Sequence, residues 1–114
     1  DENGQRYVAA LSMLSQKASN EGKRVILIQF PFRFEIYFNP KYLGLNDIHQ
    51  TNYYVELDLL RSSLPKNVEI LDILPYMKLD YQKNGRKMYF EKDGHMNEYG
   101  NQLVAKYLES YLLE

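Results

Sequence analysis

The stretch Val25-Ile-Leu-Ile-Gln-Phe30 decides the fold class of this chain. It is a short, almost continuous apolar run with β-branched residues, and Gly22 and Pro31 bound it. A strand covered by helices on both faces has this pattern, whereas a strand with one face in water alternates apolar and polar residues. The stretch therefore predicts a central strand of a parallel sheet.

A second run, Val68-Glu-Ile-Leu-Asp-Ile73, predicts another strand, which we expect Pro75 to halt. Three further segments have apolar residues at helical spacing: roughly residues 4–19, a segment capped by Thr51 or Asn52, and a segment that follows Asn97. Their apolar stripes are Tyr7, Ala10, Leu11, Leu14 and Ala18; Tyr53, Tyr54, Leu57, Leu60 and Leu64; and Leu103, Val104, Tyr107, Leu108, Tyr111 and Leu112.

The order helix, strand, helix, strand, helix is typical of an α/β fold, and right-handed crossovers make the two strands parallel neighbours. Two strands alone do not form a stable parallel sheet, and so apolar a strand needs neighbours on both edges. Either further strands lie in the irregular segments of this chain, or a missing N-terminal half or a partner chain completes the sheet, and we favour the second. Residues 32–50 and the segment after Pro75 show no sustained period and predict irregular structure.

The composition is that of one ordinary globular domain, with 114 residues, 45% hydrophobic and 25% charged. A net charge of −1 provides no long-range field for a nucleic acid, so we expect no nucleic-acid partner. The chain has no cysteine, which excludes disulfides, thiolate metal sites and a cysteine nucleophile. No apolar run is long enough to predict a membrane span.

An acid and an imidazole stand two residues apart in Asp93-Gly-His95, immediately before the third predicted helix. An imidazole can take the proton of a weak hydroxyl nucleophile and return it to the leaving group. A carboxylate bonded to the other ring nitrogen fixes the tautomer and stabilises the imidazolium. We expect Gly94 to let the chain turn between them. Asp93 and His95 are therefore of the residue types that a general base and its orienting acid require.

The run from Asp93 to Leu108 resembles the last conserved block of the SGNH (GDSL-type) hydrolases. The resemblance implies a three-layer α/β sandwich around a parallel sheet, with residues 1–114 as a single domain or as the C-terminal portion of one. It implies a serine esterase or acyl hydrolase in which Asp93 and His95 serve a serine in an earlier block. It also implies a location outside the cytoplasm. We expect no cofactor, and we expect no metal because the sequence has no His-x-x-x-His pair and no second carboxylate cluster.

The pair is spaced as Asp-x-His, more tightly than the Asp-x-x-His of many GDSL lipases, and is similar to the alginate O-acetyltransferase-like branch. In that branch the strand that ends in Pro is followed by a segment that reaches a Tyr, here Pro31 to Tyr37. The resemblance therefore implies an acyl ester, above all acetyl, of a small molecule or carbohydrate as the substrate. Hydrolysis and transfer to a carbohydrate both remain open.

The nucleophile that this chemistry needs is missing from the sequence pattern. No serine stands in a Gly-Asp-Ser or strand-to-helix elbow, and we expect all of them in helices or at helix ends. The segment alone is therefore expected to be inactive. The serines are Ser12, Ser15, Ser19, Ser62, Ser63 and Ser110.

Other interpretations of the same residues stay open. Asp93-Gly-His95 also fits a plain turn that feeds a capped helix, and with His49 these side chains offer three metal ligands. Gly44-Leu-Asn-Asp47 matches the Gly-x-Asn-Asp oxyanion block of the family, but it stands far from a strand and is favoured as a turn with Asp47 near a helix start. The non-enzymatic alternative is an α/β interaction module that binds through the Tyr-rich segment 32–50.

Overall fold

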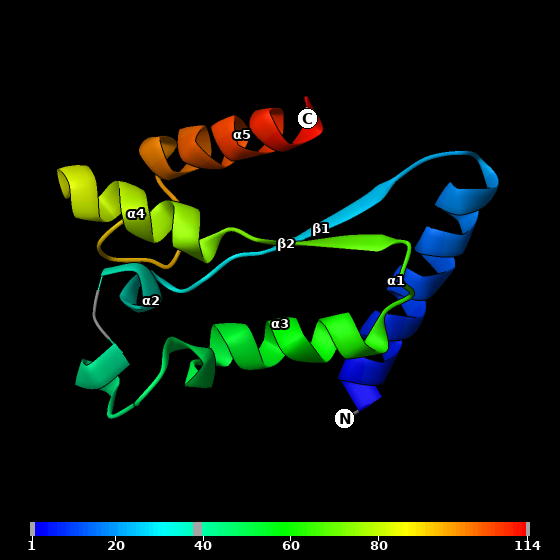
Figure 1. The fold of residues 1–114 in the computed structure, drawn as a ribbon, viewed down its shortest axis with the longest axis horizontal. Coiled ribbons are helices and arrows are strands. Elements are labelled where there is room, and N and C mark those ends of the chain that lie inside the picture. Colours follow the sequence, from blue (N-terminus) through cyan, green and yellow to red (C-terminus); the bar gives the residue numbers. More distant parts are fainter. Residues whose placement is uncertain (1, 38–39, 114) are drawn as a thin grey trace.

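The computed structural model describes residues 2–37 and 40–113 (Figure 1). Short 3-10 helices, labelled η, stand between the longer elements. The elements are α1 (Glu2–Asn20), β1 (Val25–Gln29), α2 (Arg33–Tyr37), η1 (Pro40–Leu43), η2 (Ile48–Gln50), α3 (Asn52–Ser63), β2 (Val68–Asp72), α4 (Leu74–Asn84) and α5 (Glu98–Leu112).

The strands β1 and β2 are parallel neighbours, with Val25 opposite Val68 and Gln29 opposite Asp72. This confirms the parallel pairing and the α/β class. Helices lie on both sides of the pair, α3 on one and α5 on the other (Figure 1). Alternate side chains of β2 point to opposite faces, so Val68 packs with Leu60 of α3, while Glu69 accepts a hydrogen bond from Tyr111 of α5.

The strand β1 differs from the predicted central strand. Its residues Val25–Gln29 are all half-buried, and β2 is its partner in the two-stranded sheet of the described residues. The main core lies towards the carboxyl ends of the strands. Tyr53, Leu57 and Met77 are fully buried in it, and Ile28 of β1 and Ile70 of β2 pack against it. The apolar run forms a strand, as predicted, but its side chains are less buried than those of a central strand.

Two helices replace predicted irregular structure. Pro75 was expected to end β2, but it lies in the first turn of α4, where its missing N–H would have no intrahelical partner. The carboxylate of Asp72 accepts the amide of Leu74 at 3.2 Å and so supports the start of α4. The second helix is α2, which is too short to show a period in the sequence.

The junction before α5 has the predicted cap at Asn97, and a glycine allows a close approach there. Asn97 is the N-cap, and its side chain accepts the amide of Gly100 at 2.9 Å. The Asn97 amide donates to the carbonyl of Met88, also at 2.9 Å. A Cβ on Gly100 would overlap that same carbonyl, so the close approach of α5 to Met88 requires glycine.

No helix of the described residues is both long enough and apolar enough to cross a membrane. The left-handed glycines Gly22 and Gly85 follow α1 and α4, as expected at helix ends.

Candidate functional site

The segment that carries Asp93 and His95 lies at the carboxyl end of β1. The guanidinium of Arg33, which stands four residues after β1, donates to the carbonyls of Phe90 at 3.0 Å and Glu91 at 2.6 Å. Open α/β folds build their sites at the carboxyl ends of parallel strands. The two predicted site residues therefore lie at the edge of the sheet where the fold class places chemistry.

Two tyrosines fix the same segment. The hydroxyl of Tyr89 donates to the carbonyl of Pro31 at 2.6 Å, and burial raises the pKa of Tyr89 to about 12. The hydroxyl of Tyr37 accepts the amides of Met88 at 2.7 Å and Tyr89 at 3.2 Å. An antiparallel bridge between Tyr89 and Met96 then closes the turn that contains Asp93 and His95.

The carboxyl end of β2 carries a second polar group. The hydroxyl of Tyr53 donates to the carboxylate of Asp72 at 2.8 Å and accepts the amide of Ile73 at 3.2 Å. Burial, and then the bond to Asp72, hold the pKa of Tyr53 well above its usual value. The Tyr53 hydroxyl therefore stays neutral and donates to Asp72. Because Asp72 also accepts the amide of Leu74, this carboxylate links α3 to the start of α4.

Asp93 and His95 contact each other as predicted, in an open turn. The carboxylate of Asp93 accepts the backbone amide of His95 at 2.9 Å, and the same oxygen lies 3.4 Å from Nδ1 of the ring. The side chain of His95 is 88% exposed. We expected the turn to need a glycine at position 94. Gly94 does not have a positive φ, and the space around it is open, so the turn does not depend on glycine.

The chain holds a second Asp-x-His pair, which we did not single out in the sequence. Asp47 accepts the backbone amide of His49 at 3.0 Å, and its Oδ1 lies 3.0 Å from Nδ1. These two bonds, in that order, lower the pKa of Asp47. The same Asp-x-His spacing was the signal that could have found it. An Asp–His contact by itself therefore does not identify a catalytic pair in this chain.

Asp47 also caps a helix, as the sequence indicated. It forms a capping box with Gln50 at the start of η2, and the ring of His49 packs on Tyr54 at 4.6 Å. Gly44 takes a left-handed φ of 72°, as expected for the turn interpretation of Gly44–Asp47. No group of three His, Cys, Asp or Glu side chains among the described residues is placed to hold a metal ion.

The serines lie in helices, as predicted. Ser15, Ser62 and Ser63 lie near the amino end of β2, opposite to the end of the sheet that carries His95. Ser62 and Ser63 end α3 just before β2 begins. The carbonyl of Ser15 accepts a bond from Asn67, which precedes β2 by one residue. A five-residue parallel strand spans roughly 15 Å, which separates these serines from the turn of His95.

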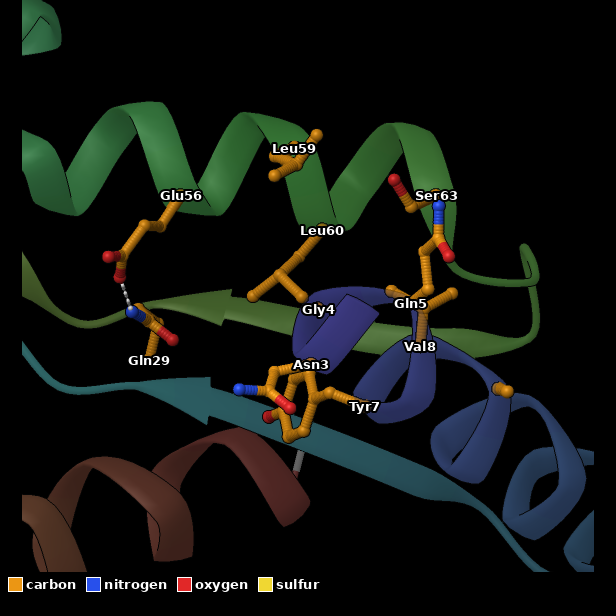
Figure 2. A pocket seen from close by; sticks show the side chains of 11 residues that line it. Asn3, Gly4, Gln5, Tyr7, Val8, Gln29, Glu56, Leu59, Leu60 and Ser63 are labelled. Atoms are coloured by element: carbon orange, nitrogen blue, oxygen red, sulfur yellow. Dashed lines mark hydrogen bonds between the residues drawn. The ribbon is translucent and has the colours of Figure 1, made fainter. Parts of the chain in front are cut away.

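A groove of about 800 Å³ lies between α1 and α3 (Figure 2). Gln29 donates to the carboxylate of Glu56 at 2.6 Å within it, and Leu60 and Tyr7 form part of its apolar lining. Neither Asp93 nor His95 is among the residues that line it. The predicted pair and this groove are separate features.

No protein-family model, no curated protein and no solved structure matches the chain.

Proposed function

We propose that Asp93 and His95 form the general-base half of an SGNH-type acyl-transfer site. The contact between Asp93 Oδ1 and His95 Nδ1 supports this, because it leaves the second ring nitrogen, Nε2, available for proton transfer. Among the described residues no hydrogen-bond partner of Nε2 is seen, so this nitrogen is open to a hydroxyl nucleophile and its ester. The reaction is hydrolysis of an O-acyl ester, above all an acetyl ester, or its transfer to a carbohydrate.

The serine comes from a segment other than residues 1–114. The exposure of His95 supports this, because a general base works from a site that other groups enclose. The sheet points the same way, since each of its strands has one edge that is not paired with another strand of the described residues. A further parallel strand beside β1 would bury more of its apolar side chains and complete the three-layer sandwich.

The test uses the native polypeptide or complex that contains this chain, with p-nitrophenyl acetate as the substrate. His95→Ala is expected to lower turnover by at least about a hundredfold, because general-base catalysis contributes that much or more. His49→Ala is the matched control, since His49 has the same Asp-x-His contact, and it should leave turnover within about twofold. Unchanged turnover in His95→Ala, or a loss confined to His49→Ala, would refute the assignment.

A fluorophosphonate probe locates the nucleophile in the same protein. The label is expected on a serine outside residues 1–114, and the 114-residue chain alone should stay unlabelled. Labelling of Ser12, Ser15 or any other serine of this chain would contradict the proposal that the serine comes from elsewhere.

The second candidate is a non-catalytic interaction module, and the exposure of the segment after β1 favours it. Phe32 is 58% exposed and stacks on Phe34, and Tyr42 is 80% exposed. Absence of any phosphonate-labelled serine in the native protein, together with unchanged turnover in His95→Ala, would favour this module over the enzyme.

A further inference from the structure

A second cavity, of about 530 Å³, lies between α2 and α4, which pack side by side. Its volume falls within the range of small-molecule sites. Its lining combines aromatic rings and amides with ammonium groups, whereas no Lys or Arg is among the described residues that line the groove between α1 and α3. The lining residues used below are Tyr37, Tyr42, Tyr81, Lys78, Lys83 and Asn84.

The ammonium groups give the cavity a positive character. Lys78 is half-buried, and desolvation lowers its pKa, so a negative charge in the cavity would stabilise its charged form. Lys83 also lines the cavity. Nζ of Lys87 lies beside it, 3.3 Å from the hydroxyl of Tyr81. These cations outweigh the partial negative charge that the carboxyl end of α4 contributes.

The nearby carboxylates are engaged elsewhere. Glu35 is buried, and its two oxygens accept the amides of Phe32 and Tyr53. The carbonyl of Glu35, rather than its carboxylate, is 3.4 Å from Nζ of Lys78. Asp80 accepts the hydroxyl of Tyr99 at 2.6 Å. Lys78 therefore has the Glu35 carbonyl as a partner, and neither acid forms a direct bond to Lys83 in the part of the chain described.

The aromatic wall is held in place. The rings of Tyr37 and Tyr81 meet at 4.6 Å, and the Lys87 ammonium lies 4.3 Å from the centre of the Tyr37 ring. The Tyr37 hydroxyl accepts the backbone amides of Met88 and Tyr89, which fixes the position of the ring. Flat aromatic faces pack well on another ring, and lysines suit phosphate as point charges.

We propose that this cavity binds a phosphomonoester carried on a ring, with the phosphate at Lys78 and Lys83 and the ring against Tyr37 and Tyr81. The ligand needs neither Asp93 nor His95, so this site is independent of the acyl-transfer proposal. Phenyl phosphate is the simplest probe of both parts of the site.

Isothermal titration of the chain with phenyl phosphate tests the proposal. Lys83→Gln and Lys78→Met, which keeps the apolar stem, should each weaken binding by about tenfold, the effect of one lost charge-assisted bond. Lys17→Gln, on the exposed face of α1, is the matched control and should leave binding unchanged. Equal binding by the lysine variants and the parent chain, or no binding by the parent chain, would overturn the site.

Two further measurements separate the phosphate from the ring. Inorganic phosphate should bind at least about tenfold more weakly than phenyl phosphate, because stacking on an aromatic side chain contributes that much. Equal affinities would overturn the ring part. Tyr42→Ala changes an exposed residue at the cavity, so folding should survive and phenyl phosphate should bind more weakly. Unchanged affinity in Tyr42→Ala would contradict an aromatic contact between the ligand and the wall of this cavity.

Discussion

One carboxylate oxygen of Asp93 serves two groups of His95: it accepts the backbone amide at 2.9 Å and lies 3.4 Å from Nδ1 of the ring. The first contact holds the turn, and the second faces the imidazole. Because these two roles need different properties of the acid, substitutions at Asp93 can separate them.

Asp93→Asn keeps an oxygen for the His95 amide but removes the charge that faces the ring. We expect it to leave the free energy of unfolding within about 0.5 kcal/mol and to lower ester turnover of the native protein by at least about tenfold. Chemical denaturation and the p-nitrophenyl acetate assay measure the two effects. Asp47→Asn is the control, and equal losses of turnover in both variants would contradict the assignment to Asp93.

Gly100→Ala should destabilise the fold by roughly 1–3 kcal/mol, because the new methyl overlaps the carbonyl of Met88 and forces α5 away. Gly94→Ala enters open space at an ordinary φ, so it should change stability by less than about 0.5 kcal/mol. Urea unfolding of both variants checks the contrast. Equal stability of the two would show that α5 does not pack so closely on Met88.

Glu35→Ala should cost roughly 2–4 kcal/mol, because it leaves the amides of Phe32 and Tyr53 without the acceptors they have at 2.9 and 3.2 Å. Glu56→Ala is the control, since Glu56 bonds Gln29 at the exposed surface and should cost less than about 1 kcal/mol. Thermal unfolding measures both. A smaller loss at Glu35 than at Glu56 would speak against a structural role for the buried acid.

Ser15→Ala should stabilise the chain by about 1 kcal/mol. The Ser15 hydroxyl is buried and has no hydrogen-bond partner among the described residues, so its removal relieves a desolvation cost. Ser12→Ala, one turn earlier and half-buried, is the comparison and should have a smaller effect. Denaturant midpoints decide this, and a loss of stability in Ser15→Ala would reveal a partner for the hydroxyl.

The Arg24–Glu69 pair predicts an acid-sensitive contribution to stability. Side-chain hydrogen bonds from Arg24, at 2.5 and 2.8 Å, and then from Tyr111, lower the pKa of Glu69 from 4.5 to about 2. A carboxyl with a lower pKa in the folded chain stabilises it above about pH 4.5, and this contribution disappears as the pH falls towards 2.

The advantage of the parent chain over Glu69→Gln should therefore shrink as the pH is lowered from neutral to about 2. Arg24→Gln should reduce the acid dependence in the same way, because it removes the main cause of the lowered pKa. Urea unfolding across this pH range measures the effect. A stability difference that does not change with pH would contradict the lowered pKa of Glu69.

Local sequence patterns predicted most of the elements and missed two helices. The caps at Thr51 and Asn97 are local, since each lies within a few residues of the helix it begins, and both were visible in the sequence. Pro75 was misjudged because proline both ends strands and begins helices, and the Asp72 carboxylate that supports α4 comes from outside the helix.

The candidate pair was visible for the same reason, because Asp93 and His95 are two residues apart and their contact is local. The sequence did not show whether this pair is unique. Asp47 and His49 make the same contact, and the spacing alone does not distinguish the two pairs. The cavity of Tyr37 and Lys78 was beyond prediction, since it joins residues far apart in the chain, in two segments whose sequence shows no sustained helical period.

The sequence by itself determined the α/β class, the parallel neighbours β1 and β2, and the Asp93–His95 turn, because apolar periodicity, caps and short turns depend on neighbours along the chain. Only the tertiary structure decided which groups from distant parts of the chain contact one another. It tied the His95 segment to the end of β1 through Arg33 and Tyr89, pressed Gly100 against Met88, and left β1 half-buried. Those contacts depend on how distant segments pack, and packing is set by the shape and burial of the whole core.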